Sequence, residues 1–210
     1  MPKFLRYAVL VSALILDVWG IYTLTGPKVD GPFVVVLDPG HGGDDPGAVV
    51  GEDCEKDIDL AVALLVREQL AGQEDLVVKM TRSEDVFIPL SDRAAYANGE
   101  EADLFVSIHA NALDNNTEYA GIMTFHHPKK SDGKSPAKQI QAAVCNETGG
   151  IDRGVRSEDY AVLRETEMPA VLVETGFMTC PEELALLTDA AYQQKLAAGI
   201  AQGILKYAGR

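Results

Sequence analysis

Residues 33–43 read Phe-Val-Val-Val-Leu-Asp-Pro-Gly-His-Gly-Gly, an apolar run followed at once by a glycine-rich turn. The run at 33–37 contains three consecutive valines. Short β-branched runs of this kind are typical of strands buried on both faces of an α/β sheet. The glycines and the proline around His41 predict a sharp turn that lifts this imidazole clear of the sheet edge. The stretch therefore predicts a central strand with a histidine presented at its carboxyl end.

The rest of the chain alternates apolar runs with segments of helical periodicity, without internal repeats. Such alternation predicts an α/β fold with a largely parallel or mixed sheet and helices on both faces. The simplest division is an amino-terminal membrane anchor or signal segment at 1–24, a linker at 25–31 and a single domain at 32–210. The predicted strands are 33–37, 76–80, 104–108, 121–125, 160–164 and 170–173, and the predicted helices are 57–70, 91–98, 137–148, 182–187 and 191–207.

The composition is that of an ordinary globular protein, with 47% hydrophobic and 24% charged residues in a chain of 210. The formal net charge is −14. This charge argues against nucleic acid as a ligand, because a phosphate-binding surface needs clustered Lys and Arg. Cys54, Cys145 and Cys180 form no CxxC pair, so they indicate neither a thiolate zinc cluster nor a thioredoxin-like redox pair. One disulfide with one free thiol, or three reduced thiols, are both open.

The amino-terminal segment carries Lys3 and Arg6 ahead of an apolar run at 7–24, a pattern typical of an export signal or a membrane anchor. The run has nearly the ~20 residues that span a bilayer. No clean small-x-small cleavage site precedes Gly26, which favours an uncleaved anchor over a removed signal. Asp17 counts against a membrane span, and a buried amphipathic helix is the remaining alternative. Both export interpretations place the rest of the chain outside the cytoplasm.

Three predicted strands lead to a polar residue that an apolar strand does not require. His41 follows the first strand, His109 directly follows the strand at 104–108, and Glu174 directly follows the strand at 170–173. Ligand crevices of open α/β sheets lie beyond the carboxyl ends of the strands. We therefore expect these three side chains to converge, although they are far apart in the sequence.

Glu55 precedes the helix predicted at 57–70 and should lie in the same crevice. Two imidazoles and one carboxylate form a zinc site of the catalytic type, with a further position left for water. Glu174 can then take a proton from the attacking water and return it to the leaving nitrogen. Asn111 lies two residues past His109, where it is a candidate for binding a substrate carbonyl or for a purely structural role. Each histidine alone is more typical of a core or loop residue, and spacing alone leaves the question open.

Five blocks of sequence decide the question. LDPGHGGDDPGA, CEKDIDLA, MTR, ADLFVSIHANA and MPAVLVETGF occur in this order, and the similarity extends from residue 33 to residue 205. In these blocks the chain resembles the N-acetylmuramoyl-L-alanine amidase family, the zinc amidases of the amidase-3 type. The resemblance implies that His41, Glu55 and His109 bind Zn²⁺ and that Glu174 is the catalytic carboxylate.

The same resemblance implies a reaction, a substrate and a fold. The reaction is hydrolysis of the amide between the lactyl group of N-acetylmuramic acid and the L-alanine of the stem peptide, so peptidoglycan is the expected partner. The fold is a twisted sheet of about six strands with helices on both faces, consistent with the usual size of sheets. Residues 32–210 are then a catalytic domain that acts outside the cytoplasm, anchored to the membrane or secreted.

Some features depart from the family pattern or leave alternatives. The family's GF-x-S-N is replaced by residues 176–180, Gly-Phe-Met-Thr-Cys, and residues 113–137 are too short for a helix that blocks the active site. Arg82 and Arg93 predict ion pairs within the domain rather than substrate contacts. A zinc peptidase that cuts within the stem peptide would use the same metal and base, whereas a non-catalytic wall-binding protein would lack one of these groups.

An anchored amidase without wall-binding repeats also resembles the spore-cortex branch of the family. Some members of that branch work with a partner protein that promotes zinc loading. The sequence therefore leaves open a role in sporulation and a protein activator.

Overall fold

The structure, a computed structural model, describes residues 31–114, 116–130 and 132–210. Contacts divide the chain into two units, Met1–Pro32 and Phe33–Arg210, and the second contains every helix and strand named below. The strands are β1 (Phe33–Pro39), β2 (Val49–Val50), β3 (Asp53–Cys54), β4 (Leu76–Met80), β5 (Leu104–Asn111), β6 (Ile122–His126), β7 (Asp152–Ser157) and β8 (Ala170–Phe177). The helices are α2 (Glu55–Gln69), α3 (Leu90–Gly99), α4 (Lys134–Thr148), α5 (Ala161–Glu165), α6 (Pro181–Leu187) and α7 (Ala190–Tyr207).

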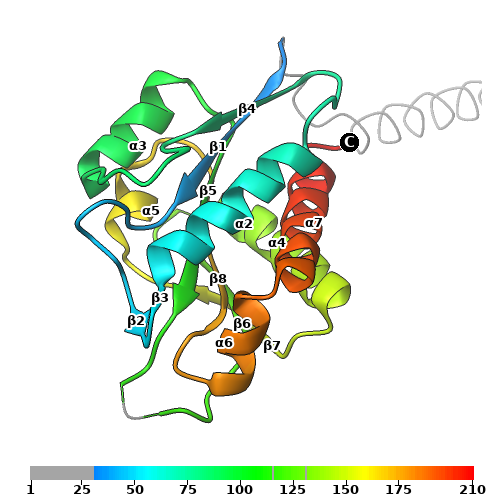
Figure 1. Cartoon of the computed structure of the whole chain (residues 1–210). Helices are drawn as coiled ribbons and strands as arrows, with labels where there is room; N and C mark the ends of the chain where they lie inside the picture. The colour runs from blue at the N-terminus through cyan, green and yellow to red at the C-terminus, as the bar shows by residue number, and fades with distance from the viewer. Residues whose placement is uncertain (1–30, 115, 131) are drawn as a thin grey trace, which may run out of the picture. The chain divides into compact units, whose positions relative to one another are not determined.

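Six strands form one sheet in the order β4-β1-β5-β8-β6-β7, and β2 pairs with β3 in a separate ribbon (Figure 1). β4, β1, β5 and β8 run parallel to one another. β6 is antiparallel to β8, and the edge strand β7 is parallel to β6. The prediction of a mixed α/β sheet of about six strands is confirmed. β1, β5 and β8 are adjacent, so their carboxyl ends meet at one edge of the sheet.

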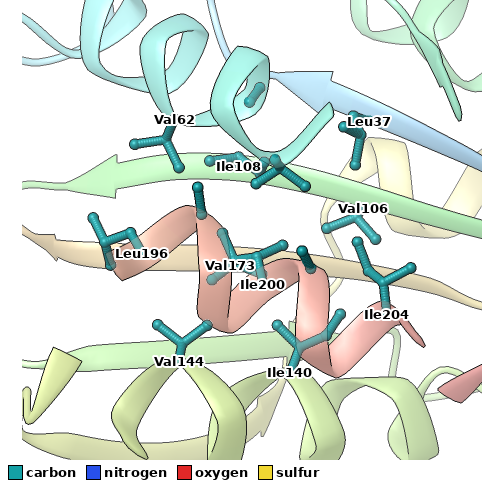
Figure 2. Close-up of a cluster of buried hydrophobic side chains, with 14 of the residues drawn as sticks. Leu37, Val62, Val106, Ile108, Ile140, Val144, Val173, Leu196, Ile200 and Ile204 are labelled. Carbon is teal, nitrogen blue, oxygen red and sulfur yellow. The ribbon is translucent and has the colours of Figure 1, made fainter. Parts of the chain in front are cut away.

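Helices α2, α4 and α7 cover one face of the sheet (Figure 1). Figure 2 shows Val106 and Val173 of the sheet close to Ile200 and Ile204 of α7, and all four side chains are fully buried. Burial of one such side chain contributes roughly 1.5–3 kcal/mol. This layer anchors α2, which carries a candidate ligand at its first residue.

Helices α3 and α5 cover the opposite face. Val36, Phe105 and Leu172 point toward them and pack in a second core with Ala97 of α3 and Leu163 of α5. Side chains alternate between the two faces of a strand, so a strand that is covered on both sides has to be apolar throughout. This arrangement explains the continuous apolar runs in the sequence and confirms the prediction of helices on both faces.

One predicted strand is a helix, and one strand of the six-stranded sheet was not predicted. The two-residue strands β2 and β3 were not predicted either. The strand expected at 160–164 is the short helix α5, with Tyr160 as its N-cap residue. Val162 and Leu163 are adjacent and both buried on one side, whereas a strand would point them to opposite faces. Short apolar runs do not distinguish the two structures. The unpredicted strand of the six-stranded sheet is β7, an edge strand of mostly polar residues. Its sequence therefore lacks the apolar run or alternation by which a strand is predicted.

The structure also bears on the segments outside this unit and on the cysteines. Within the described ranges, no helix combines the length and the hydropathy that a membrane span requires. The predicted anchor or signal segment at 1–24 lies outside the described residues, as does most of the predicted linker. Cys54, Cys145 and Cys180 are all described and are free thiols, so the protein has three unpaired cysteines rather than a disulfide.

Candidate active site

The four predicted site residues lie together at the carboxyl ends of β1, β5 and β8. His41 follows β1, His109 lies in β5 and Glu174 lies in β8, where His109 and Glu174 are register partners on neighbouring strands. Glu55 is the first residue of α2, which begins directly after β3. The topology therefore brings together residues that are separated by up to 133 positions in the sequence (41 to 174).

The turn after β1 is held by two buried arginines. His41 has a positive φ of 55°, a left-handed conformation that agrees with the turn predicted from the glycines around it. Arg93 Nη2 donates to the carbonyl oxygen of His41 at 2.5 Å, and Arg82 Nη2 donates to that of Gly40 at 2.6 Å. Arg93 also forms the predicted ion pair, with Asp38. In the part of the chain that the structure describes, Arg82 instead donates to backbone carbonyl groups.

The candidate ligand atoms of His41, Glu55 and His109 converge. Glu55 Oε1 lies 3.2 Å from His41 Nε2 and 2.9 Å from His109 Nδ1. The two imidazole rings meet edge to face, with centroids 5.0 Å apart. Ligand atoms of a tetrahedral zinc ion lie about 3.4 Å apart, because each lies about 2.1 Å from the metal. The three atoms are therefore spaced to hold one metal ion.

Further contacts orient these ligands. His41 Nδ1 lies 2.9 Å from Asp45 Oδ2, which leaves Nε2 to face the site. Glu55 accepts hydrogen bonds from the backbone N–H groups of Ala48 at 2.9 Å and Ala110 at 3.3 Å. Carboxylates that bind the outer nitrogen of a histidine fix its tautomer and ring orientation in metal sites. Asp45 was not predicted as a site residue, although it lies four residues after His41 in the glycine-rich turn.

The electrostatics favour an ionised Glu55. Burial alone would favour the protonated carboxyl, but hydrogen bonds from His109 and His41 lower the pKa of Glu55 to about 2. Burial also favours the neutral form of His41. The hydrogen bond and the charge of Glu55 outweigh this and raise the pKa of His41 above its ordinary value. A carboxylate between two imidazoles is thus stable here only with a positive charge nearby, whether from a proton or from a metal ion.

A second carboxylate, Asp59, completes the group of possible ligands. One ligand atom each of His41, Glu55, Asp59 and His109 lies within 4.8 Å of the others. Asp59 is completely buried, and burial together with the nearby charge of Glu55 raises its pKa well above the ordinary value. Asp59 was not among the predicted site residues. Its signal was the helical spacing i, i+4 from Glu55, which places two carboxylates on one face of α2.

Glu174 is the remaining acidic residue of the site. It is 8% exposed, and its Oε2 has no hydrogen-bond partner among the described residues. Burial, reinforced by the charge of Glu55, raises the pKa of Glu174 to about 7, although the two histidines oppose the shift. A carboxyl group with a pKa near neutrality and no structural hydrogen bond at one oxygen is suited to accepting and releasing a proton.

A cavity of about 570 Å³ is lined by His41, Glu55, His109 and Glu174, but not by the completely buried Asp59. Asn111, a candidate for substrate binding or for a structural role, also lines this cavity. The lining also includes the apolar residues Phe87 and Leu90, which are 55% and 58% exposed. A pocket of about 970 Å³ lies between α2 and α7 but contains none of the candidate residues. The candidate catalytic and metal-binding residues therefore line the smaller of the two cavities.

Comparison with known proteins identifies the family. The sequence model of the family described as N-acetylmuramoyl-L-alanine amidase matches residues 35–206. The chain belongs to the N-acetylmuramoyl-L-alanine amidase family. The predicted resemblance is confirmed, and with it the assignment of the chain to a family of amidases.

Curated relatives include an endolysin of Bacillus phage SPP1, which is 40% identical over 177 residues that make up 81% of this chain. The germination-specific N-acetylmuramoyl-L-alanine amidase of Bacillus subtilis is 35% identical over 189 residues, or 83% of this chain. The alignment spans 64% of the endolysin and 79% of the germination-specific amidase. The similarity thus covers most of this chain but only part of the phage protein.

Solved structures of the family have the same fold. The N-acetylmuramoyl-L-alanine amidase from Clostridium difficile 630 is 39% identical and superposes with a TM-score of 0.84, covering 86% of this chain and 98% of that chain. The CwlD amidase from Clostridioides difficile, solved in complex with the GerS lipoprotein, is 34% identical with a TM-score of 0.80 and covers 84% of this chain and 98% of that chain. The predicted single α/β fold is confirmed.

Proposed function

We propose that this chain is a zinc-dependent amidase that hydrolyses the bond between N-acetylmuramic acid and L-alanine in peptidoglycan. One observation carries the proposal. Ligand atoms of His41, Glu55 and His109 lie within 4.8 Å of one another. The buried carboxyl of Glu174 lines the same cavity and has no hydrogen bond at Oε2 among the described residues. Membership of the amidase family supplies the substrate class.

The donor set fits a zinc ion. Two imidazole nitrogens and one carboxylate oxygen are the ligands of many catalytic zinc sites, and the contacts of His41 and Glu55 fix their orientation. A bound zinc ion would supply Lewis-acid polarisation of the scissile carbonyl and of the attacking water. The low pKa of Glu55 keeps this ligand ionised at neutral pH. The protein thus offers the ion a ready-made anionic donor.

Glu174 would act as general base and then as general acid. Its ionised form accepts a proton from the attacking water as the carbon–oxygen bond forms. It then donates this proton to the leaving nitrogen of L-alanine as the carbon–nitrogen bond breaks. Because its pKa is about 7, both forms are accessible near neutral pH, which is the condition for a group that serves both steps.

The cavity would hold the substrate next to these groups. Asn111 is half-buried on the cavity wall and can donate to a carbonyl of the stem peptide through its amide. The apolar wall at Phe87 and Leu90 can pack against the hydrocarbon parts of the substrate. These contacts would place the lactyl–alanine amide between the metal ligands and Glu174.

Cell-wall chemistry implies action outside the cytoplasm. We propose residues 1–24 as a membrane anchor or export signal, 25–31 as a linker and 32–210 as the catalytic domain. Similarity to the germination-specific amidase of Bacillus subtilis supports a role in the spore cortex. The complex of CwlD with a lipoprotein supports a protein activator for this chain as well.

The decisive experiment compares the full chain, purified in mild detergent, with its Glu174→Gln variant. Both are incubated with purified peptidoglycan, with zinc or with a chelator, and the products are identified by mass. Stem peptides that begin with L-alanine should appear only with zinc and the unaltered protein. Glu68→Gln on the exposed side of α2 is the matched control and should keep full activity.

The products also separate this proposal from its alternatives. Fragments cut within the stem peptide would indicate a zinc peptidase. Zinc binding without any cleavage, also in the presence of a candidate lipoprotein activator, would favour a non-catalytic wall-binding protein. A chain that binds no zinc at all would refute the metal assignment.

A further inference from the structure

Asp59 is a buried carboxylate without a structural partner. Its residue exposure is 0%, and neither Oδ1 nor Oδ2 has a hydrogen bond among the described residues. Leaving one ionised group unpaired in a protein interior costs several kcal/mol. Buried polar atoms without partners are rare in native proteins and require an explanation. The explanation has to lie in what Asp59 faces.

Asp59 faces the metal-binding group. Its Oδ2 lies 3.8 Å from His109 Nδ1, which is too long for a hydrogen bond but close to the spacing of two ligands on one zinc ion. Asp59 lies one helical turn after Glu55 in α2, so the two carboxylates project from the same side of the helix. Both are thus directed at the point that the imidazoles surround.

The chain leaves room for this approach at Gly40. A Cβ atom at this position would lie 2.7 Å from Asp59 Oδ2 and 2.5 Å from His109 Nδ1. Any larger residue would therefore separate Asp59 from His109. The nearby cation Arg82 does not take the role of partner, because its hydrogen bonds go to backbone carbonyl groups, including that of Gly40.

We infer that Asp59 is a fourth protein ligand of the metal, in addition to the two histidines and Glu55. The inference rests on the proposed function, because it concerns the same metal site. A dication bound by Glu55 and Asp59 leaves no net charge on the ion and its carboxylates, which accounts for two acidic side chains in one buried space. Water or substrate would then be a fifth ligand of the ion, and catalytic zinc sites can expand to five ligands.

The test replaces Asp59 by Asn and by Ala in the full chain and measures the metal itself. Apparent zinc affinity is determined by competition with a chromophoric chelator. The visible spectrum of the cobalt(II)-loaded protein is recorded as well, because its intensity and band positions report the number and kind of ligands. Asp57→Asn is the matched control, since Asp57 lies on the same helix but is exposed.

If Asp59 is a ligand, both variants should bind zinc at least ~10-fold more weakly, since even groups outside the ligand set change affinity by this factor. Their cobalt spectra should differ from that of the unaltered protein, and the Asp57→Asn spectrum should not. The spectrum decides the question. Superimposable cobalt spectra for the unaltered protein and both Asp59 variants would overturn the inference, whatever the affinities.

Two controls keep the outcomes separate. Thermal unfolding of the metal-free proteins checks the fold, and Asp59→Asn should be at least as stable as the unaltered chain, because the amide is uncharged and has nearly the same shape as the carboxyl group. If the unaltered protein binds neither zinc nor cobalt, the proposed function as a whole is refuted. Normal metal binding that neither Asp59 substitution changes would refute only the assignment of Asp59 as a ligand.

Discussion

Arg93 Nη1 lies 2.9 Å from Asp38 Oδ1, and the two side chains are 3% and 1% exposed. Asp38 also accepts hydrogen bonds from Thr81 Oγ1 at 2.7 Å and from Ser107 Oγ at 2.8 Å. Arg93 extends the network to the backbone, where it donates to the carbonyl group of His41. Asp38, just before the glycine-rich turn, therefore has a structural role in holding the turn, whereas His41 in the same turn lines the cavity.

Breaking this pair should destabilise the fold. Arg93→Met removes the cation and leaves Asp38 charged and buried, and loss of one partner of a buried pair costs about 3–5 kcal/mol. Chemical denaturation of the metal-free protein measures this loss directly. Arg67→Met, at an exposed position of α2, is the control and should change the free energy of unfolding by less than about 0.5 kcal/mol. A loss below 1 kcal/mol for Arg93→Met would show that the pair is not important for stability.

Asp45 should tune the affinity of the metal site through His41. Its Oδ2 lies 2.9 Å from His41 Nδ1, and the ionised carboxylate holds the ring with Nε2 toward Glu55. Asp45→Asn keeps the shape but removes the charge, so zinc affinity should fall about 10–100-fold. Titration against a fluorescent chelator measures the change. Asp44→Asn at the exposed neighbouring position should leave the affinity unchanged, and equal affinities for both variants would contradict the role of Asp45.

Glu174 should make the metal-free protein less stable as the pH rises. Its folded pKa of about 7 exceeds the ordinary 4.5, so the folded state retains a proton that the unfolded state has already released. This contribution to stability is complete below pH 4.5 and is lost as the pH rises through 7. The full difference amounts to roughly 3 kcal/mol, since each pKa unit corresponds to about 1.4 kcal/mol.

Glu174→Gln removes this dependence because the amide stays neutral. With a chelator present to remove metal, the variant should have a larger free energy of unfolding than the unaltered protein. This advantage should grow by roughly 2 kcal/mol between pH 5.5 and pH 8. Denaturation at both pH values measures the difference, with Glu68→Gln as control. Saturating zinc should reduce the advantage, because a nearby cation favours the ionised carboxylate. An advantage that is the same at both pH values would mean that Glu174 ionises normally.

The sequence was sufficient for the parts of the site that depend on strand ends. Continuous apolar runs such as 104–108 can be satisfied only in a sheet covered on both faces, and the polar residue after such a run must lie at the sheet edge. His109 and Glu174 were predicted to converge for this reason, and they are register partners on neighbouring strands. The role of Glu55 depended more on the family resemblance than on its spacing.

Other parts could not be derived from local pattern. The order of strands decides that β7, with few apolar residues, is an edge strand beside β6, and nothing in its own sequence signals this. Arginine is usually exposed, so the sequence does not indicate that Arg82 and Arg93 are buried. Asp59 had a signal in its helical spacing from Glu55. The depth at which it is buried, however, follows from packing of α2 over the turn at Gly40.

Gly40 should be essential for metal binding because of its small size. Cβ of an alanine at this position would lie 2.2 Å from His109 Cε1, so the imidazole would have to swing out of the site. Gly40→Ala should therefore fold but bind zinc at least ~100-fold more weakly, more than is expected for the orienting residue Asp45. Competition with a chelator gives the affinity, and circular dichroism checks the fold. Gly99→Ala is the control, since a Cβ there meets no atom within 4 Å, and its affinity should match that of the unaltered protein. Normal zinc binding by Gly40→Ala would mean that His109 is free to leave its observed position, and the metal site would then need a different third ligand.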